Sequence, residues 1–284
     1  MRPRMIAKIV LLEYLPDDLI FCDTLFLVMC LIFLSLHQHP TYKLIVAANR
    51  DEFYARKTAP AHFWKDHPHI LGGRDLEASG SWMAMNKNGK ISLVTNYRDL
   101  ANLKRTAPSR GQLVSDFLIH EDGAEQYLNK VSERGAQYNG YNLLAGYADE
   151  LWHQSNYRKG IQKLETGVYG LSNHLLDTPW PKVQRGKEKF QAAIRDSTIQ
   201  PDTLFELLYD EQRAQDQFLP NTGIGLERER ALSSMFIKTN GYGTRCSTVI
   251  LITQDNEVLF SERTYNLETF AHSTSQFQFD ILHD

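Results

Sequence analysis

The order of strand and helix candidates along this chain constrains its fold more than any other feature. Apolar segments of strand length occur in three groups, placed early, in the middle and late in the sequence. These segments are residues 30–36, 43–48, 81–86, 91–95, 141–147, 150–154, 231–238, 246–253 and 257–262. Short polar turns join neighbours within a group, which predicts antiparallel hairpins rather than the strand–helix–strand alternation of a parallel sheet.

Helix candidates fill the gaps between the strand groups. One follows Ser109, and a second is indicated by a capping box formed by Asp122 and Glu125. A third helix has Pro181 at a favourable first position, and a fourth begins at Asp202. Runs of hairpins separated by helices favour an α+β layered sandwich with largely antiparallel sheets.

Composition restricts the classes of protein to which the chain can belong. Its 284 residues are 42% hydrophobic and 23% charged, as in an ordinary globular protein. The net charge of −3 and the lack of any basic run argue against a nucleic-acid partner. The 3 cysteines lack CxxC spacing, which argues against a disulfide framework and a zinc ribbon. We therefore expect a reducing, cytoplasmic location and no metal.

The first residues need a separate interpretation. Residues 19–36 are apolar over a length that can span a membrane, but Asp23 lies inside them and the flanks lack a decisive basic bias. A secretory signal peptide fits poorly, because no suitable cleavage site follows. Dividing the segment at Met29 gives a buried strand at 30–36. We therefore expect residues 1–29 to be an upstream extension, 30–284 to form a single domain, and no stable membrane insertion.

Cys30 could carry chemistry if it were the N-terminal residue of the mature protein. Its thiol would be the nucleophile, and its α-amino group, with an ordinary pKa of about 7.7–8.0, would be the base. The turn between the first two strands brings Arg50 and Asp51 back beside Cys30. Arg50 would lower the thiol pKa, and Asp51 could orient the amine. The spacing equally allows a buried structural cysteine beside a strand-end salt bridge that involves Glu52.

Further polar residues lie at other strand and helix ends. Asn96 ends an apolar strand and Asn173 precedes a helix, and an amide N–H is suited to binding an oxyanion. Arg245 begins a late strand and could bring a second arginine. Each residue also suits an ordinary turn or cap. Their shared position at element ends predicts that they meet Cys30 in one pocket.

Several segments together resemble a known family. They are MCLIF (29–33), VAANRDEFYARKTAPAHFW (46–64), GGRDLEASGSWMAMNKNGKISLVTNYRD (72–99), GLSNHLLDTPWPKV (170–183) and GTRCSTVIL (243–251). In these segments the chain resembles the NRDE family, also called the transport and Golgi organisation 2 family. The match runs from Met29 almost to the C-terminus, and the 28 residues before it depart from the family pattern.

The resemblance has consequences for fold and site. That family resembles N-terminal-nucleophile (Ntn) hydrolases, particularly the cysteine-type penicillin and bile-salt amidases, which share a four-layer αββα sandwich. It implies Cys30 as the nucleophile, Asp51 as the residue that holds its amine, and positive charge from two arginines. It also implies two polar or oxyanion-binding asparagines. The full set is Cys30, Arg50, Asp51, Asn96, Asn173 and Arg245.

Two classes of function follow from the resemblance. The first is an amidase that cleaves a carbon–nitrogen amide bond of a small molecule and needs no cofactor. The second is a non-hydrolytic carrier or chaperone on the same fold, connected with haem trafficking, lipids or the Golgi. Haem would need axial ligands, for which His37, His39, His67 and His69 are candidates, although surface histidines beside proline explain these positions equally well. No CxxCH motif supports covalent haem attachment. The expected partner is a small-molecule substrate or haem.

Overall fold

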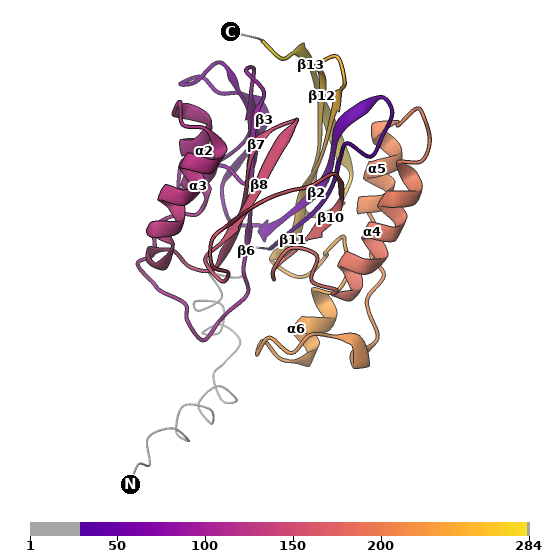
Figure 1. Ribbon diagram of the computed structural model, residues 1–284. Helices are drawn as coiled ribbons and strands as arrows, with labels where there is room; N and C mark the ends of the chain where they lie inside the picture. Colours follow the sequence, from indigo (N-terminus) through magenta and orange to yellow (C-terminus); the bar gives the residue numbers. More distant parts are fainter. Residues whose placement is uncertain (1–28, 283–284) are drawn as a thin grey trace.

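The computed structural model describes residues 29–282. In this part of the chain two antiparallel β-sheets pack face to face, and helices cover the outer side of each sheet (Figure 1). The predicted α+β class and the four-layer αββα order are confirmed. Most of the expected upstream extension lies outside the described residues.

The first sheet carries the start of the described chain. Its strands, in spatial order, are β10 (Gly167–Leu171), β1 (Met29–Leu36), β2 (Tyr42–Phe53), β11 (Tyr242–Thr253), β12 (Glu257–Tyr265) and β13 (His272–Asp280). Strands β1 and β2 are antiparallel, with Cys30 opposite Arg50 and Met29 opposite Asp51. The turn between the two strands therefore returns the NRDE motif to the start of β1, as the sequence predicts.

The second sheet follows the order of the chain. Its strands are β3 (Thr58–Phe63), β4 (Ile70–Asp75), β5 (Met83–Asn86), β6 (Lys90–Asn96), β7 (Tyr141–Tyr147), β8 (Glu150–Ser155) and β9 (Ile161–Lys163). Each strand pairs antiparallel with the next, so this sheet is a meander built from short connections. Both sheets thus agree with the predicted hairpin organisation.

Helices pack on the outer faces of both sheets (Figure 1). The helices of the described residues are α2 (Gly111–Ile119), α3 (Ala124–Glu133), α4 (Pro181–Ala193), α5 (Pro201–Leu208) and the short α6 (Leu226–Ala231), with 3₁₀ turns at Gly135–Gln137 and Asp216–Phe218. Helices α2 and α3 pack on the second sheet, and α4 and α5 pack on the first. Pro181 is the first residue of α4, as predicted, because its fixed φ suits a helix start and its missing N–H would be unpaired there anyway.

The alternation of side chains along β1 decides which residues face the site. Ile32 and Leu34 point into the apolar layer between the two sheets. Leu31 and Phe33 point the other way, into the layer beneath α4 and α5. Because successive side chains of a strand face opposite sides, Cys30 shares the inter-sheet face with Ile32. Each fully buried side chain of this size contributes about 1.5–3 kcal/mol to folding.

Some sequence-based expectations about local structure were wrong. The strand expected at residues 231–238 does not form: Ala231 ends α6, and the buried run after it makes only an isolated β-bridge, between Lys238 and Gly243. Periodicity cannot distinguish a buried strand from another buried segment. The capping box is not formed: Gly123 is the N-cap of α3 and Asp122 pairs with Lys130. Several strands were not predicted from the sequence, namely β3, β4, β9, β10 and β13.

Within residues 29–282, none of the helices combines the length and the apolar character that crossing a membrane requires.

Candidate active site

Cys30 lines a cavity whose walls come from both sheets. The cavity has a volume of about 240 Å³. It is lined by Cys30, Arg50, Glu52, Arg56, Asp75, Ser81, Trp82, Val94, Asn96, Ala107, Pro108, Ser109, Arg110, Gly111 and Asn139. A larger cavity, of about 700 Å³, is lined mainly by the β5–β6 hairpin, the end of α2, the β7–β8 turn and residues 281–282, and it contains none of the predicted catalytic residues. The smaller cavity is therefore the candidate site.

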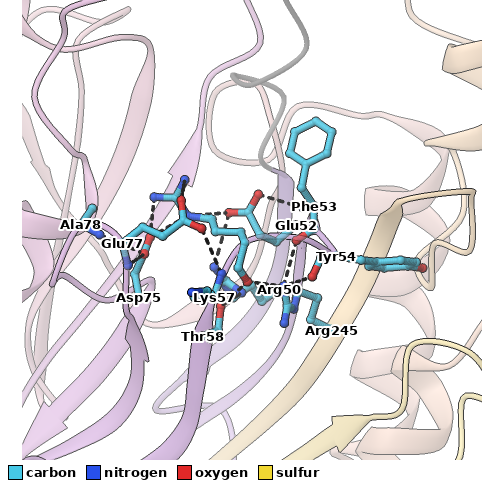
Figure 2. A network of polar contacts seen from close by, with 11 residues as sticks. Arg50, Glu52, Phe53, Tyr54, Lys57, Thr58, Asp75, Glu77, Ala78 and Arg245 are labelled. Atoms are coloured by element: carbon cyan, nitrogen blue, oxygen red, sulfur yellow. Dashed lines mark hydrogen bonds and ion pairs between the residues drawn. The ribbon is translucent and has the colours of Figure 1, made fainter. Parts of the chain in front are cut away.

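Arg50 forms one wall of the cavity beside Cys30. Its guanidinium lies 4.2 Å from the ring centre of Trp82 and donates a hydrogen bond to Thr58 Oγ1 at 3.1 Å. It also forms a buried ion pair with Glu52, with 3.3 Å between Nη2 and Oε2 (Figure 2). The strand-end salt bridge weighed from the sequence thus exists, and it lies in the same cavity as the cysteine.

The side chain of Asp51 is fully buried on the face of β2 that lies opposite to Arg50, towards α4. Thr244 donates a hydrogen bond to its Oδ1 at 2.6 Å. Its Oδ2 accepts no hydrogen bond from any described residue. Burial raises the pKa of Asp51 to about 6, while Lys182, Thr244 and Arg50 act in the opposite direction. In the strand register Asp51 is opposite Met29, the residue directly before Cys30.

Lys182 is a charged residue that the sequence analysis did not single out. It lies in the first turn of α4 and is 2% exposed, which is unusual for a lysine. Among the described residues, Nζ has no hydrogen-bond partner. Burial lowers the pKa of Lys182, and the carboxylate of Asp51 opposes this effect more than any other charge. In the sequence the segment TPWPKV that carries it indicated a helix start at Pro181 and the family resemblance, but gave no sign that this lysine is buried.

The thiol of Cys30 is in its neutral form at physiological pH when Met29 precedes it. Burial and the negative charge of Asp51 raise the pKa of Cys30 to about 12, although Arg50 and the backbone N–H of Asp51 act in the opposite direction. The expectation of a depressed thiol pKa assumes a free α-ammonium on Cys30 and stays a prediction, while in the chain with residue 29 attached the pKa is raised. Desolvation outweighs the one arginine that lies beside the sulfur.

Two asparagines approach Cys30 from neighbouring segments. Asn96, at the end of β6, lines the cavity. Asn173 follows β10 and donates a hydrogen bond from Nδ2 to the backbone oxygen of Asn96 at 3.2 Å. The adjacent Ser172 donates from Oγ to the backbone oxygen of Cys30 at 3.3 Å. Asn96 therefore faces the cavity, while Asn173 connects the end of β6 to the strand beside Cys30.

Arg245 occupies a different environment from the other candidates. It lies at a bulge in β11, and its guanidinium donates hydrogen bonds to the backbone oxygens of Phe53 and Tyr54 at 2.8 and 3.1 Å (Figure 2). A third bond reaches the backbone oxygen of Arg56. Arg245 thus stabilises the turn after β2 and does not line the cavity.

The structure brings only part of the predicted set into one cavity. Cys30, Arg50 and Asn96 line it, whereas Asp51, Asn173 and Arg245 lie beside or behind it. The catalytic roles given to these residues stay predictions. Trp82 and Arg110 also line the cavity and were not among the residues predicted from the sequence. Neither carried a usable signal, because the spacing between distant segments does not show which side chains share a cavity.

Of the histidines suggested as haem ligands, His39 is buried and its ring nitrogens are both hydrogen-bonded to the backbone. His39 is 4% exposed, accepts hydrogen bonds at Nδ1 from the backbone of Thr41 and Tyr42, and bonds through Nε2 to the backbone oxygen of Asp196. These contacts hold the β1–β2 turn. Within residues 29–282, no three His, Cys, Asp or Glu side chains gather as metal ligands would.

Comparison with solved structures finds proteins of low sequence identity. One is a Caenorhabditis elegans N-acylethanolamine-hydrolyzing acid amidase ortholog, 8% identical, covering 78% of this chain and 92% of that protein, with a TM-score of 0.38. Another is a mutant of the conjugated bile acid hydrolase from Clostridium perfringens, 10% identical, covering 89% of this chain and 84% of that protein, with a TM-score of 0.37.

Comparison with sequences identifies clear relatives. The transport and Golgi organization protein 2 homolog of Homo sapiens is 36% identical over 275 residues, which are 89% of this chain and 99% of the human protein. Transport and Golgi organization protein 2 of Drosophila melanogaster is 30% identical over 260 residues, or 83% and 92%. The family model for Transport and Golgi organisation 2 matches residues 29–267. The family resemblance inferred from the NRDE segments is thus confirmed, and the chain belongs to the Transport and Golgi organisation 2 family.

Proposed function

We propose that this protein is an N-terminal-nucleophile cysteine hydrolase that cleaves the carbon–nitrogen bond of a small amide at Cys30. One observation carries the proposal. The side chain of Cys30 lines the cavity, and the residue before it lies opposite Asp51 in the strand register. Asp51 has a buried oxygen that accepts no hydrogen bond from any described residue. A free α-amino group on Cys30 would give that oxygen a partner.

The reaction requires that the bond between Met29 and Cys30 be absent in the mature protein. The α-amine then accepts the thiol proton as Sγ attacks the carbonyl carbon of the amide. The Asn96 amide stabilises the negative oxygen of the tetrahedral intermediate, and Asn173 holds Asn96 in position. When the carbon–nitrogen bond breaks, the leaving amine takes the proton from the α-ammonium. Water then hydrolyses the thioester by the same steps, releases the acid and restores the thiol.

Release of the α-amine also changes the electrostatics of the thiol. In the described chain Cys30 has a raised pKa because it is desolvated and close to Asp51. An α-ammonium beside it would neutralise the influence of Asp51 and favour the thiolate. Removal of residue 29 would therefore supply the base and activate the nucleophile in one event.

The proposal is tested on the full chain in two measurements. Intact mass shows whether the mature protein begins at Cys30, and incubation with small amides shows whether Cys30 gains the mass of an acyl group. Cys30→Ala should abolish hydrolysis. Cys246→Ala is the matched control, since Cys246 is also buried and lies opposite Arg50 on the other side of β2. Hydrolysis that survives in Cys30→Ala contradicts the proposal, and tight binding without any turnover would favour a carrier.

A further inference from the structure

We infer that Arg110 binds an anionic group of the substrate, so that the amide cleaved at Cys30 carries a carboxylate. The inference rests on the proposed hydrolase function and adds the class of substrate. Arg110 precedes α2 and lines the same cavity as Cys30. The two residues belong to opposite layers, because Cys30 is part of the first sheet and α2 packs on the second.

The other charges of the cavity are already paired with one another. Glu52 forms its ion pair with Arg50, at 3.3 Å. Asp75 forms an ion pair with Arg56, with 2.7 Å between Oδ2 and Nη2 (Figure 2 shows the Asp75 side chain in this network). These two acids offset the charges of two arginines. The remaining cation in the lining of the cavity is Arg110.

Arg110 has no acidic partner within the described residues. Its guanidinium donates one hydrogen bond, from Nη1 to the backbone oxygen of Gly140 at 3.0 Å. Most of its five N–H donors are therefore available to a ligand. Burial lowers the pKa of Arg110 to about 10, while Glu52 and Cys30 oppose this effect, so the side chain stays cationic at neutral pH. A partly desolvated cation without a counterion favours an anion from solution.

The backbone around Arg110 is held in place before any ligand arrives. The N–H of Ser81 donates to the backbone oxygen of Gly111 at 3.1 Å. A Cβ atom on Gly80 would lie 2.4 Å from the carbonyl carbon of Gly111, so the two segments meet in direct backbone contact. This contact holds the backbone next to Arg110, and the bond to Gly140 holds its guanidinium, which lowers the entropy lost on binding.

The shape of the Arg110 guanidinium and the size of the cavity indicate the class of ligand. A guanidinium matches a carboxylate through two parallel hydrogen bonds. A cavity of about 240 Å³ is small compared with the usual range of ligand pockets, about 300–1,000 Å³. We therefore expect a compact N-acyl compound with a carboxylate a few bonds from the scissile amide, as in an N-acyl amino acid.

The experiment separates binding from turnover. In the full chain carrying Cys30→Ala, calorimetry measures the affinity for a short-chain N-acylglycine and for the N-acylethanolamine with the same acyl group, which lacks the carboxylate. We expect a clear preference for the glycine compound. Arg110→Gln should weaken its binding on the order of tenfold to a hundredfold, because a hydrogen-bonded charge is lost, and should leave the ethanolamine compound unchanged. Arg110→Lys should restore part of the affinity.

A matched control tests whether general positive charge is responsible. Arg105→Gln removes an exposed arginine of the same loop that does not line the cavity, and it should change neither affinity. Equal affinities for the two compounds in the Cys30→Ala chain, or unchanged binding in Arg110→Gln with a normal melting temperature, would overturn the inference. If the intact chain hydrolyses amides without this preference, the proposed function stands and the inference fails. If the preference is found but no amide is cleaved, the anion site stands and the proposed function fails.

Discussion

The carboxylate of Asp51 and the ammonium of Lys182 attract each other behind the start of β1, yet they form no direct ion pair. Each is the strongest opposite charge acting on the other. Asp51 Oδ2 and Lys182 Nζ also have no hydrogen-bond partner among the described residues. Two buried charges with unused hydrogen-bonding atoms are costly, which suggests that the site is completed by a further polar group. In the proposed mature protein that group is the α-amine of Cys30.

Replacing Lys182 should change the pH dependence of the proposed activity. Asp51 must be ionised to hold the amine, and its pKa is raised by burial to about 6 while Lys182 counteracts the rise. Lys182→Met removes this counteraction, so the pKa of Asp51 rises. The acid limb of the pH profile of kcat/KM should therefore move to higher pH by about one pH unit or more. Lys189→Met, which changes an exposed lysine of the same helix, should leave the limb in place. An unshifted limb in Lys182→Met would show that the two charges are not coupled.

Alkylation should report the state of the Cys30 thiol. In a chain that retains Met29, Cys30 should react slowly with iodoacetamide near neutral pH, because burial and Asp51 raise its pKa to about 12. In a chain that begins at Cys30, the reaction should be faster by a wide margin. Cys246, whose pKa is raised by burial and by Glu262, should react slowly in both chains. Mass spectrometry of the labelled peptides gives both rates. Equal rates at Cys30 in the two chains would contradict activation by the α-amine.

A glycine far from Cys30 in sequence should also affect the site. A Cβ atom on Gly73 would lie 2.0 Å from the ring of Trp82, so Gly73→Ala must move this buried ring. Trp82 stacks on Arg50, which would lose its position beside Cys30. We expect about 1–3 kcal/mol of lost stability and at least about a tenfold loss in kcat/KM. Gly123→Ala is the control, since no atom lies within 4 Å of the added Cβ and the backbone there is ordinary.

Glu262 should make the stability of the protein depend on pH. It is 1% exposed, accepts the backbone N–H of Ala61 at 2.6 Å, and has a pKa raised by burial to about 7. The unfolded chain loses this proton at lower pH than the folded chain. The titration of Glu262 therefore has no effect on the free energy of unfolding below about pH 4. As the pH rises from there to 7, the buried carboxylate destabilises the fold increasingly.

Glu262→Gln removes the charge and keeps an oxygen for Ala61. Its free energy of unfolding should equal that of the unaltered chain at pH 4 and exceed it at pH 8, by on the order of 3 kcal/mol. Urea denaturation at the two pH values measures the difference. Glu257→Gln, at an exposed position of the same strand, should have little effect at either pH. If Glu262→Gln raised the free energy of unfolding by the same amount at both pH values, titration of Glu262 would be ruled out as the cause.

The sequence by itself determined the local elements and the arrangement of the NRDE motif. Turn signals and apolar runs of strand length predicted β1, β2, the β5–β6 hairpin and α4, because these features depend on neighbouring residues. The two-residue period of a strand also requires Arg50 and Asp51 to face opposite sides of β2. Which of these sides faces the cavity could not be predicted, since that depends on where the second sheet packs.

Tertiary structure decided which distant charges surround Cys30. Arg110 reaches the cavity because α2 packs against the turn at Gly80, and Lys182 reaches Asp51 because α4 packs on the first sheet. Arg245, which the sequence placed in the pocket, is held instead by the backbone oxygens that follow β2. Spacing along a chain fixes the face of a strand or helix on which a side chain lies. Only the packing of layers brings residues from separate segments into one electrostatic environment, where burial and nearby charges set their pKa values.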